Sequence, residues 1–391
     1  MEKLASGSQQ IGNITKYFRT AMKYYLIAGE ASGDLHASNL IRELKVLDAN
    51  ARIRAWGGDL MQAQGAELVK HYRDLAFMGF AEVLANLRVI LGNLRFCKQD
   101  ILSFNPDAVI LIDYPGFNLR IAKFLHKHNI PVIYYISPQV WAWKQSRVRT
   151  IRKVVDKMLV ILPFEKDFYD RHGIKVEFVG HPLLDALPEI SSEPEMETGD
   201  HPLIALLPGS RKQEIKAVLP IMLKIIPRFP EANFAIAGVS SIDDEFYQNI
   251  SNGYSIPVFK GQTYDLLRKA SAALVTSGTA TLETALIGTP EVVCYKGGTI
   301  SYLIARRLVK VKYISLVNII VNREVVKELI QHELTADAIE DELRLLLYDN
   351  IHRAKVSEAY AELCRLLGGP GASKRAAGIV FEYIIGAVNK G

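Results

Sequence analysis

The chain of 391 residues lacks several features that would quickly assign it to a class. It has three cysteines, Cys97, Cys294 and Cys364, which form no CxxC pair, so neither a disulfide framework nor a cysteine-type zinc site is predicted. It contains no run of about 18 apolar residues, which excludes a membrane-spanning helix. We therefore expect a protein of the reducing cytosol whose membrane contact, if any, is peripheral.

Several motifs of nucleotide and metal chemistry are also absent. The sequence contains no GxxxxGK[ST] loop, no GxGxxG, no HExxH and no Asp-x-Asp pair of the kind that holds a divalent ion on a nucleotide sugar. Its 47 basic residues only slightly outnumber its 42 acidic ones, which suits an anionic substrate but is too small an excess for a nucleic-acid arm. We expect chemistry without a metal, a cofactor or a nucleic-acid partner.

Length and composition predict two domains. A chain of this length with 49% apolar residues can bury two cores. Residues 1–21 are polar, lack the apolar core of a signal peptide and are expected to be a disordered extension. The acidic, proline-bearing stretch 188–201 is typical of a linker between a first domain, 22–187, and a second, 202–367. A C-terminal helix is expected within 368–391.

Short apolar runs that end in Gly, Ser or Asp alternate with helical periodicity in both halves. This alternation of strand and helix patterns predicts parallel strands joined by helices, an α/β fold of two Rossmann-like domains. The expected strands are 22–28, 53–56, 108–113, 132–136, 157–162, 176–179, 203–207, 234–237, 257–259, 273–276 and 292–295. The chain from 323 to 389 is expected to be helical.

Acidic and hydroxyl side chains follow two strands of the first half, at the edge where open α/β sheets bind ligands. Glu30, Ser32 and Asp34 follow the first strand, although Ser32 and Asp34 equally suit a helix cap. Asp113 ends the strand 108–113 and is placed to take a proton from a substrate hydroxyl. The plainer interpretation of Asp113 is a turn former.

Two other first-half stretches carry large apolar or aromatic side chains. One face of a predicted helix over 78–96 suits either the core or an acyl-binding groove beside anionic head groups. Its members proposed to bind lipid are Met78, Phe80, Val83, Leu84 and Leu87. Trp141 and Trp143, followed by a basic cluster, suit stacking on a sugar, or else packing beside a solvated helix face.

The second half contains two turns that suit a diphosphate. Gly209, Ser210 and Arg211 lead from a strand into a helix, where free N–H groups, a positive dipole end and a guanidinium gather. A second Gly turn opens another helix and is formed by Ser277, Gly278, Thr279 and Ala280, with Glu283 one turn further on. Its N–H groups suit phosphate oxygens and Glu283 suits ribose hydroxyls, the alternative being a capping box.

Taken together and in this order, a series of motifs resembles those of the lipid-A-disaccharide synthases. They are Ala28 to Asp34, Ile112 to Asn118, Ser137 to Trp143, Leu162 to Glu165, Gly180 to Pro182, Leu207 to Arg211 and Ser277 to Glu283. The resemblance runs from about residue 22 to the C-terminus. It implies a GT-B glycosyltransferase fold, with two Rossmann-like domains facing a cleft. The last helix would return to the first domain or be exchanged in a homodimer.

The resemblance also implies an activity in lipid A and lipopolysaccharide biosynthesis, at the cytoplasmic face of the inner membrane. Such an enzyme condenses UDP-2,3-diacylglucosamine with 2,3-diacylglucosamine 1-phosphate, giving the β(1→6) disaccharide 1-phosphate and UDP. Inversion at the sugar carbon needs one base and a stabilised leaving group. Another UDP-sugar enzyme, or a lipid-binding protein without catalysis, are the alternatives.

Residue roles follow from the same resemblance. Asp113 and Arg211 are implied as the important carboxylate and arginine, with Glu30 as the alternative base. UDP is expected to contact Ser277, Gly278, Thr279, Ala280, Glu283 and Asn318, together with the turn at Gly209 and Ser210. The acceptor and its acyl chains are expected to contact Ser32, Asp34, the two tryptophans and the 78–87 face.

Overall fold

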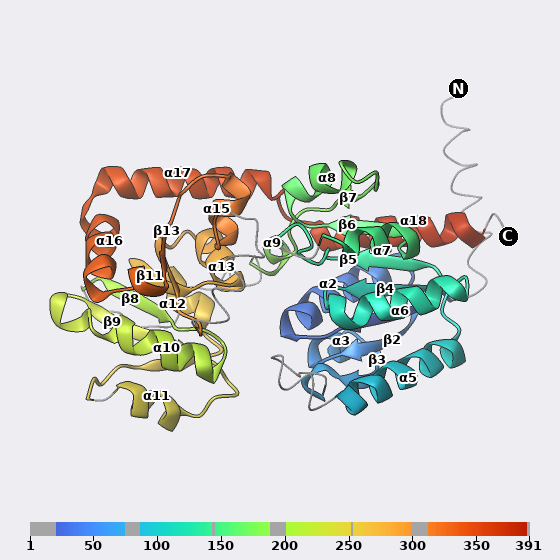
Figure 1. Ribbon diagram of the computed structural model, residues 1–391, viewed down its shortest axis with the longest axis horizontal. Helices are drawn as coiled ribbons and strands as arrows, with labels where there is room; N and C mark the ends of the chain where they lie inside the picture. The colour runs from blue at the N-terminus through green and yellow to red at the C-terminus, as the bar shows by residue number, and fades with distance from the viewer. Residues whose placement is uncertain are drawn as a thin grey trace. The chain divides into compact units, whose positions relative to one another are not determined.

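The computed structural model describes residues 21–74, 87–142, 145–187, 201–251, 253–298 and 312–388. The chain divides into two compact units, Met1–Pro182 with Gly371–Gly391, and Leu183–Pro370. Each unit contains one parallel sheet with helices around it (Figure 1). The predicted α/β class with two Rossmann-like domains is therefore confirmed. Almost all of the predicted extension and linker lies outside the described residues.

The first unit contains a seven-stranded sheet in the order β3-β2-β1-β4-β5-β6-β7. Its strands are β1 Lys23–Ala28, β2 Arg52–Gly57, β3 Glu67–His71, β4 Ala108–Ile112, β5 Val132–Tyr135, β6 Lys157–Val160 and β7 Glu177–Phe178. The central strand β4 is buried at every position, as its unbroken apolar run predicts. The edge strand β3, which the sequence analysis missed, is half-exposed and joins β2 through an irregular register.

Helices cover both faces of this sheet. They are α2 Ala31–Leu47, α3 Asp59–Ala63, α5 Leu87–Phe104, α6 Pro115–Lys127, α7 Arg147–Val154, α8 Pro163–Asp170 and α18 Ala372–Val388, with a short 3-10 helix, η2, at Tyr72–Asp74. The β1-to-β2 and β4-to-β5 crossovers run in opposite directions, so right-handed connections place α2 and α6 on opposite faces. The C-terminal α18 packs against α2, and Arg375 Nε donates to the carbonyl of Val179 at 2.8 Å. Exchange of this helix in a dimer stays a prediction.

The second unit contains a six-stranded sheet in the order β10-β9-β8-β11-β12-β13. Its strands are β8 Leu203–Leu207, β9 Asn233–Gly238, β10 Val258–Lys260, β11 Ala272–Thr276, β12 Glu291–Tyr295 and β13 Lys327–Ile330. Its helices are α9 Leu183–Ala186, α10 Lys212–Leu223, α11 Asp244–Ser251, α12 Thr263–Lys269, α13 Thr279–Ile287, α15 Leu316–Val321, α16 Ala336–Tyr348 and α17 Asn350–Leu366, with the 3-10 helices η4 Ile226–Arg228 and η5 Gln331–Glu333.

Strand β13 corrects the expectation that the chain is helical from 323 onward. Lys327 to Ile330 pairs in parallel with Val292 to Tyr295 of β12. The preceding valines, Val325 and Val326, are β-branched and favour extended backbone. After the 3-10 helix η5, α-helical structure begins again at α16, where the Thr335 side chain accepts from the N–H of Ala338 as an N-cap.

Both sheets change direction at one point in their strand order. In the first sheet that point lies between β1 and β4, and in the second between β8 and β11. Open α/β sheets bind ligands outside the carboxyl ends of the strands at such a switch point. The fold therefore predicts a functional site at the carboxyl ends of the strands next to the switch point of each sheet.

Candidate active site

The switch point of the first unit brings Glu30 and Asp113 to one edge. Ala28 of β1 pairs with Ile112 of β4, so the loops that carry these two carboxylates leave the sheet side by side. Glu30 is exposed and accepts a hydrogen bond from Ser32 Oγ at 2.9 Å. The register thus joins two predicted site residues that are more than 80 positions apart in the chain.

The backbone at Asp113 is held in an unusual conformation. Asp113 and Tyr114 have φ angles of 39° and 47°, a left-handed region that non-glycine residues rarely occupy. Asn118 Nδ2 donates to the Asp113 carbonyl at 2.9 Å, and the Tyr134 hydroxyl donates to the same oxygen. The Asp113 N–H donates to the carbonyl of Ile136 at 3.2 Å. Such fixed, sparsely populated backbone is frequent at functional sites.

The surroundings of Asp113 adapt it to exchange a proton near neutral pH. Burial, and secondarily the negative charge of Glu30, raise the pKa of the Asp113 carboxyl to about 7, although a backbone hydrogen bond from Tyr114 opposes this. The ring of Tyr114 lies over Gly29, where an added Cβ would sit 2.4 Å from a ring carbon. A side chain at position 29 would therefore displace the residue that follows Asp113.

Asp34 is a helix cap, which was the alternative to a functional role, but it caps α3 and not α2. Ser32 and Asp34 lie inside α2, so neither is the N-cap of that helix, which is Glu30. The carboxylate of Asp34 is buried and accepts N–H groups at the start of α3, from Gly58, Leu60 and Met61, at 2.8 to 3.1 Å. Asp34 therefore caps a neighbouring helix and is not positioned as an open acceptor-binding group.

Trp141 is packed rather than presented to solvent. It is 8% exposed, and its ring meets Phe164 edge to face at 4.9 Å between centroids. The buried Glu165 carboxyl accepts from the N–H of Leu162 at 3.1 Å and lies beside Trp141 and Ser137. Trp143 lies outside the described residues. On α7 the basic residues after this loop are mostly exposed, while Val148, Ile151 and Val154 are buried.

The predicted lipid-binding face is only partly described. Met78, Phe80, Val83 and Leu84 lie outside the described residues, as does the side chain of Leu87, the first residue of α5. Further along α5, Leu94, Cys97 and Ile101 are buried, so this side of the helix contributes to the core. Val89, Leu91 and Phe96 are 46%, 52% and 46% exposed, and the exposed Arg88 and Arg95 lie beside them in the sequence.

The switch point of the second unit brings the two predicted diphosphate turns together. Leu207 of β8 pairs with Val275 of β11, so the turns at Gly209 and Ser277 follow neighbouring strands. Gly209 has φ of +116°, and an added Cβ would lie 2.8 Å from Glu214 Oε2, so only glycine fits this turn. Arg211 is the N-cap residue of α10, with its side chain 54% exposed.

A carboxylate already occupies the first of these turns. Glu214 Oε2 accepts from the N–H of Ser210 at 3.1 Å, and Glu214 Oε1 accepts from Arg211 Nη1 at 2.7 Å. These are the same kinds of donors that bind phosphate oxygens at a helix N-terminus. The contacts of Glu214 therefore show that the Gly209 turn can bind an anionic oxygen.

The second turn leaves the start of α13 open. Gly278 is the N-cap residue and, within the part of the chain that the structure describes, no side chain caps the helix, so the capping box considered as the alternative for Thr279 and Glu283 is not formed. Gly278 and Thr279 are exposed, while Ala280 is partly buried. Glu283 instead forms a hydrogen bond with Tyr264, and burial raises the pKa of its carboxyl group. The uncapped N–H groups at this end of α13 suit a phosphate.

Asn318 is buried, and the contact with UDP that the resemblance implies stays a prediction. It is 0% exposed, and its Nδ2 donates to the Val326 carbonyl at 2.8 Å and to Glu328 Oε1 at 2.9 Å. Its Oδ1 accepts from the N–H groups of Val325 and Val326. Both polar atoms of the side chain are thus engaged within the unit. Glu328 was missed because its strand was not foreseen, although the run from Val325 to Ile330 is rich in β-branched residues.

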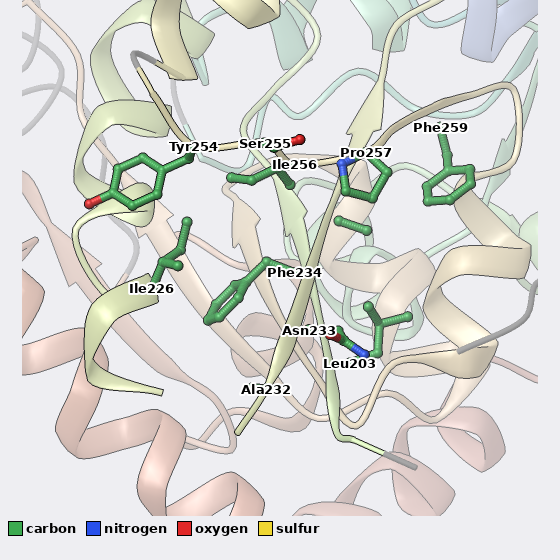
Figure 2. A pocket seen from close by; sticks show the side chains of 11 residues that line it. Leu203, Ile226, Ala232, Asn233, Phe234, Tyr254, Ser255, Ile256, Pro257 and Phe259 are labelled. Carbon is green, nitrogen blue, oxygen red and sulfur yellow. The ribbon is translucent and has the colours of Figure 1, made fainter. Parts of the chain in front are cut away.

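A cavity of about 360 Å³ in the second unit lies at the amino ends of the strands, opposite to the carboxyl ends that carry the two turns (Figure 2). Leu203 and Asn233, the first residues of β8 and β9, line it with Phe234, Ile256 and Pro257. Ligands of open α/β sheets bind at the carboxyl ends, so this cavity is separate from the candidate site. Among the described residues, no group of three or more His, Cys, Asp or Glu side chains is arranged to hold a metal ion.

Comparison with known proteins identifies the family. A family model described as lipid-A-disaccharide synthetase matches residues 24–382. The lipid-A-disaccharide synthase of Syntrophus aciditrophicus is 42% identical over 371 residues, covering 92% of this chain and 97% of that protein. The lipid-A-disaccharide synthase of Geobacter sulfurreducens is 38% identical over 377 residues, covering 93% of this chain and 98% of that protein.

Solved structures support the fold independently. The glycotransferase of kitacinnamycin aligns with a TM-score of 0.66 at 14% identity, covering 93% of this chain and 100% of that one. The UDP-GlcNAc 2-epimerase of Neisseria meningitidis aligns with a TM-score of 0.65 at 15% identity, covering 92% and 100%. These likenesses confirm the predicted GT-B fold. The family model and the curated relatives show that the chain belongs to the lipid-A-disaccharide synthases, the glycosyltransferases of lipid A biosynthesis.

Proposed function

We propose that this enzyme condenses UDP-2,3-diacylglucosamine with 2,3-diacylglucosamine 1-phosphate to give the β(1→6)-linked disaccharide 1-phosphate and UDP, with inversion at the donor carbon. The family match supports the reaction class. The observation that carries the proposal is that family motifs lie at the switch point of each sheet. In the first sheet this point carries Asp113, whose carboxyl group has a raised pKa. In the second sheet it carries the Gly209 turn, which binds the carboxylate of Glu214.

In the proposed reaction the acceptor 6-hydroxyl oxygen forms a bond to the donor sugar carbon while the bond from that carbon to the diphosphate oxygen breaks. Asp113 takes the hydroxyl proton as general base. Negative charge develops on the departing UDP, and the guanidinium of Arg211 and the open N-terminus of α13 stabilise it.

We further propose that the enzyme associates peripherally with the cytoplasmic face of the inner membrane through α5. None of the helices that the structure describes combines the length and apolarity needed to cross a membrane. Exposed apolar side chains with basic neighbours, as on α5, suit insertion at an interface rich in anionic head groups.

Product analysis tests the reaction directly. Purified enzyme is incubated with the two diacylated substrates, with and without a chelator, and the products are identified by mass spectrometry and linkage analysis. We expect the β(1→6) disaccharide 1-phosphate and UDP in both conditions. An epimerised sugar nucleotide, or no disaccharide, would reject the proposal. Saturating UDP should also raise the melting temperature, because a ligand that binds only the folded state stabilises it.

A further inference from the structure

The carboxylate of Glu328 on β13 accepts hydrogen bonds from four donors of the short segment 314–318. Its Oε2 accepts from the N–H of Ile314 at 2.9 Å. Its Oε1 accepts from the N–H and Oγ of Ser315 at 2.9 and 2.8 Å, and from Asn318 Nδ2 at 2.9 Å. Ser315 and Asn318 are both 0% exposed. A group that only accepts hydrogen bonds is required at this position.

The same segment contacts the open turn at the start of α13. The hydroxyl of Ser277 donates to the carbonyl of Ile314 at 3.3 Å, directly next to the N–H that Glu328 binds. Ser315 also accepts from the N–H of Asn318 through its Oγ and so caps α15. The chain of contacts therefore runs from Glu328 through Ile314 to Ser277.

We propose that Glu328 is a positioning residue for the nucleotide, which fixes the segment 314–318 against the Ser277 turn so that the turn is ready to bind the UDP diphosphate. This inference rests on the proposed function. Glu328 itself makes no contact with the nucleotide, since its two oxygens are already engaged with the protein. Its effect is exerted through Ile314 and Ser277.

Replacing the carboxylate with an amide tests this role. In Glu328→Gln one oxygen becomes an NH₂ group that faces N–H or O–H donors, which leaves buried donors without acceptors. We expect the segment to shift and the Kd for UDP to rise about tenfold or more, equivalent to about 1.4 kcal/mol. The KM for the sugar nucleotide should rise in parallel, while the KM for the diacylglucosamine 1-phosphate should stay unchanged.

A matched control separates this effect from a general loss of charge. Glu324 precedes β13, has a side chain 55% exposed and pairs with Lys327 at 3.2 Å, so Glu324→Gln should leave UDP binding unchanged. Calorimetric titration of UDP into each full-length variant supplies the Kd values. A Glu328→Gln enzyme whose Kd for UDP stays within about twofold of the wild-type value overturns the inference.

A second variant keeps the test decisive should Glu328→Gln fail to fold. Ser315→Ala removes one donor to Glu328 and the cap of α15, while its buried hydroxyl is out of reach of any nucleotide. We expect a UDP Kd raised about threefold to tenfold, and an unchanged Kd overturns the inference here too. Failure of the wild-type enzyme to bind UDP would instead overturn the proposed function.

Discussion

Glu30 and Asp113 follow two paired strands, β1 and β4, and the charge of Glu30 adds to the effect of burial on the pKa of Asp113, which reaches about 7. A base whose pKa lies near the working pH combines sufficient ionisation with sufficient proton affinity. The pair therefore provides a way to tune the base by means of its neighbour.

Replacement of Glu30 should move the pH profile. The base works when ionised, so kcat/KM should rise with pH through about 7 in the wild type. Glu30→Gln removes the like charge, which lowers the pKa of Asp113 and shifts this rise to lower pH. Initial rates between pH 5 and 9 measure the shift. Glu43→Gln, further along α2, serves as the control with an unmoved profile. Abolished activity in Glu30→Gln would instead assign the base to Glu30.

Asp113→Asn should remove the base without disturbing the loop. Asn tolerates the left-handed backbone that position 113 adopts, and it preserves the shape of the side chain. We expect kcat to fall by about 10² to 10⁴ while the Kd for UDP stays unchanged. Single-turnover rates and calorimetry give the two values. Near-normal turnover would show that Asp113 is not the base.

Much of this site could be predicted from the sequence because its loops end apolar strands. The apolar runs before Gly29, Asp113, Gly209 and Ser277 predicted the strands. Parallel pairing then places the end of β1 beside that of β4, and the end of β8 beside that of β11. Local spacing did not reveal partners set by tertiary structure. Asp34 caps a helix that begins 25 residues later, and Asn318 is buried by a strand that was expected to be helix.

The ion pair of Arg211 and Glu214 predicts opposite effects for its two members. Arg211→Ala removes a cation from the diphosphate turn and should raise the Kd for UDP about tenfold or more. Glu214→Gln removes the anion that occupies the same donors, and should lower that Kd by up to about fivefold, since an exposed pair contributes at most about 1 kcal/mol. Calorimetry at fixed ionic strength compares them. Weaker binding in Glu214→Gln would mean that Glu214 orients Arg211 instead of competing with UDP.

The exposed apolar side chains of α5 should contribute to membrane binding. Leu91→Asp replaces a side chain that is 52% exposed, so it should spare the fold while weakening co-sedimentation with anionic vesicles about tenfold. Leu345→Asp on α16, where Leu345 is 38% exposed, is the matched control and should bind vesicles like the wild type. Equal vesicle binding by both variants would remove α5 from the proposed interface.

Glu291 should make the stability of the second unit depend on pH. The residue is 1% exposed, and neither oxygen of its carboxyl group has a hydrogen-bond partner among the residues that the structure describes. Burial raises its pKa well above the usual value, and the neighbouring charge of Glu328 adds to this. Above the unfolded pKa the folded state holds a proton that the unfolded state releases. Stability therefore falls as pH rises, by about 1.4 kcal/mol per pH unit, until the folded pKa is reached.

Glu291→Gln removes this ionisation and keeps the size of the side chain. Between pH 4 and pH 8 the melting temperature of the variant relative to wild type should therefore rise with pH for as long as the folded wild-type enzyme keeps this proton, by several degrees. Differential scanning calorimetry across this range measures the trend. Glu358→Gln, at an exposed position of α17, should show the same pH dependence as wild type. A melting-temperature difference that stays constant with pH would show that Glu291 does not hold its proton in the folded enzyme, because only a group with unequal proton binding in the two states makes stability change with pH.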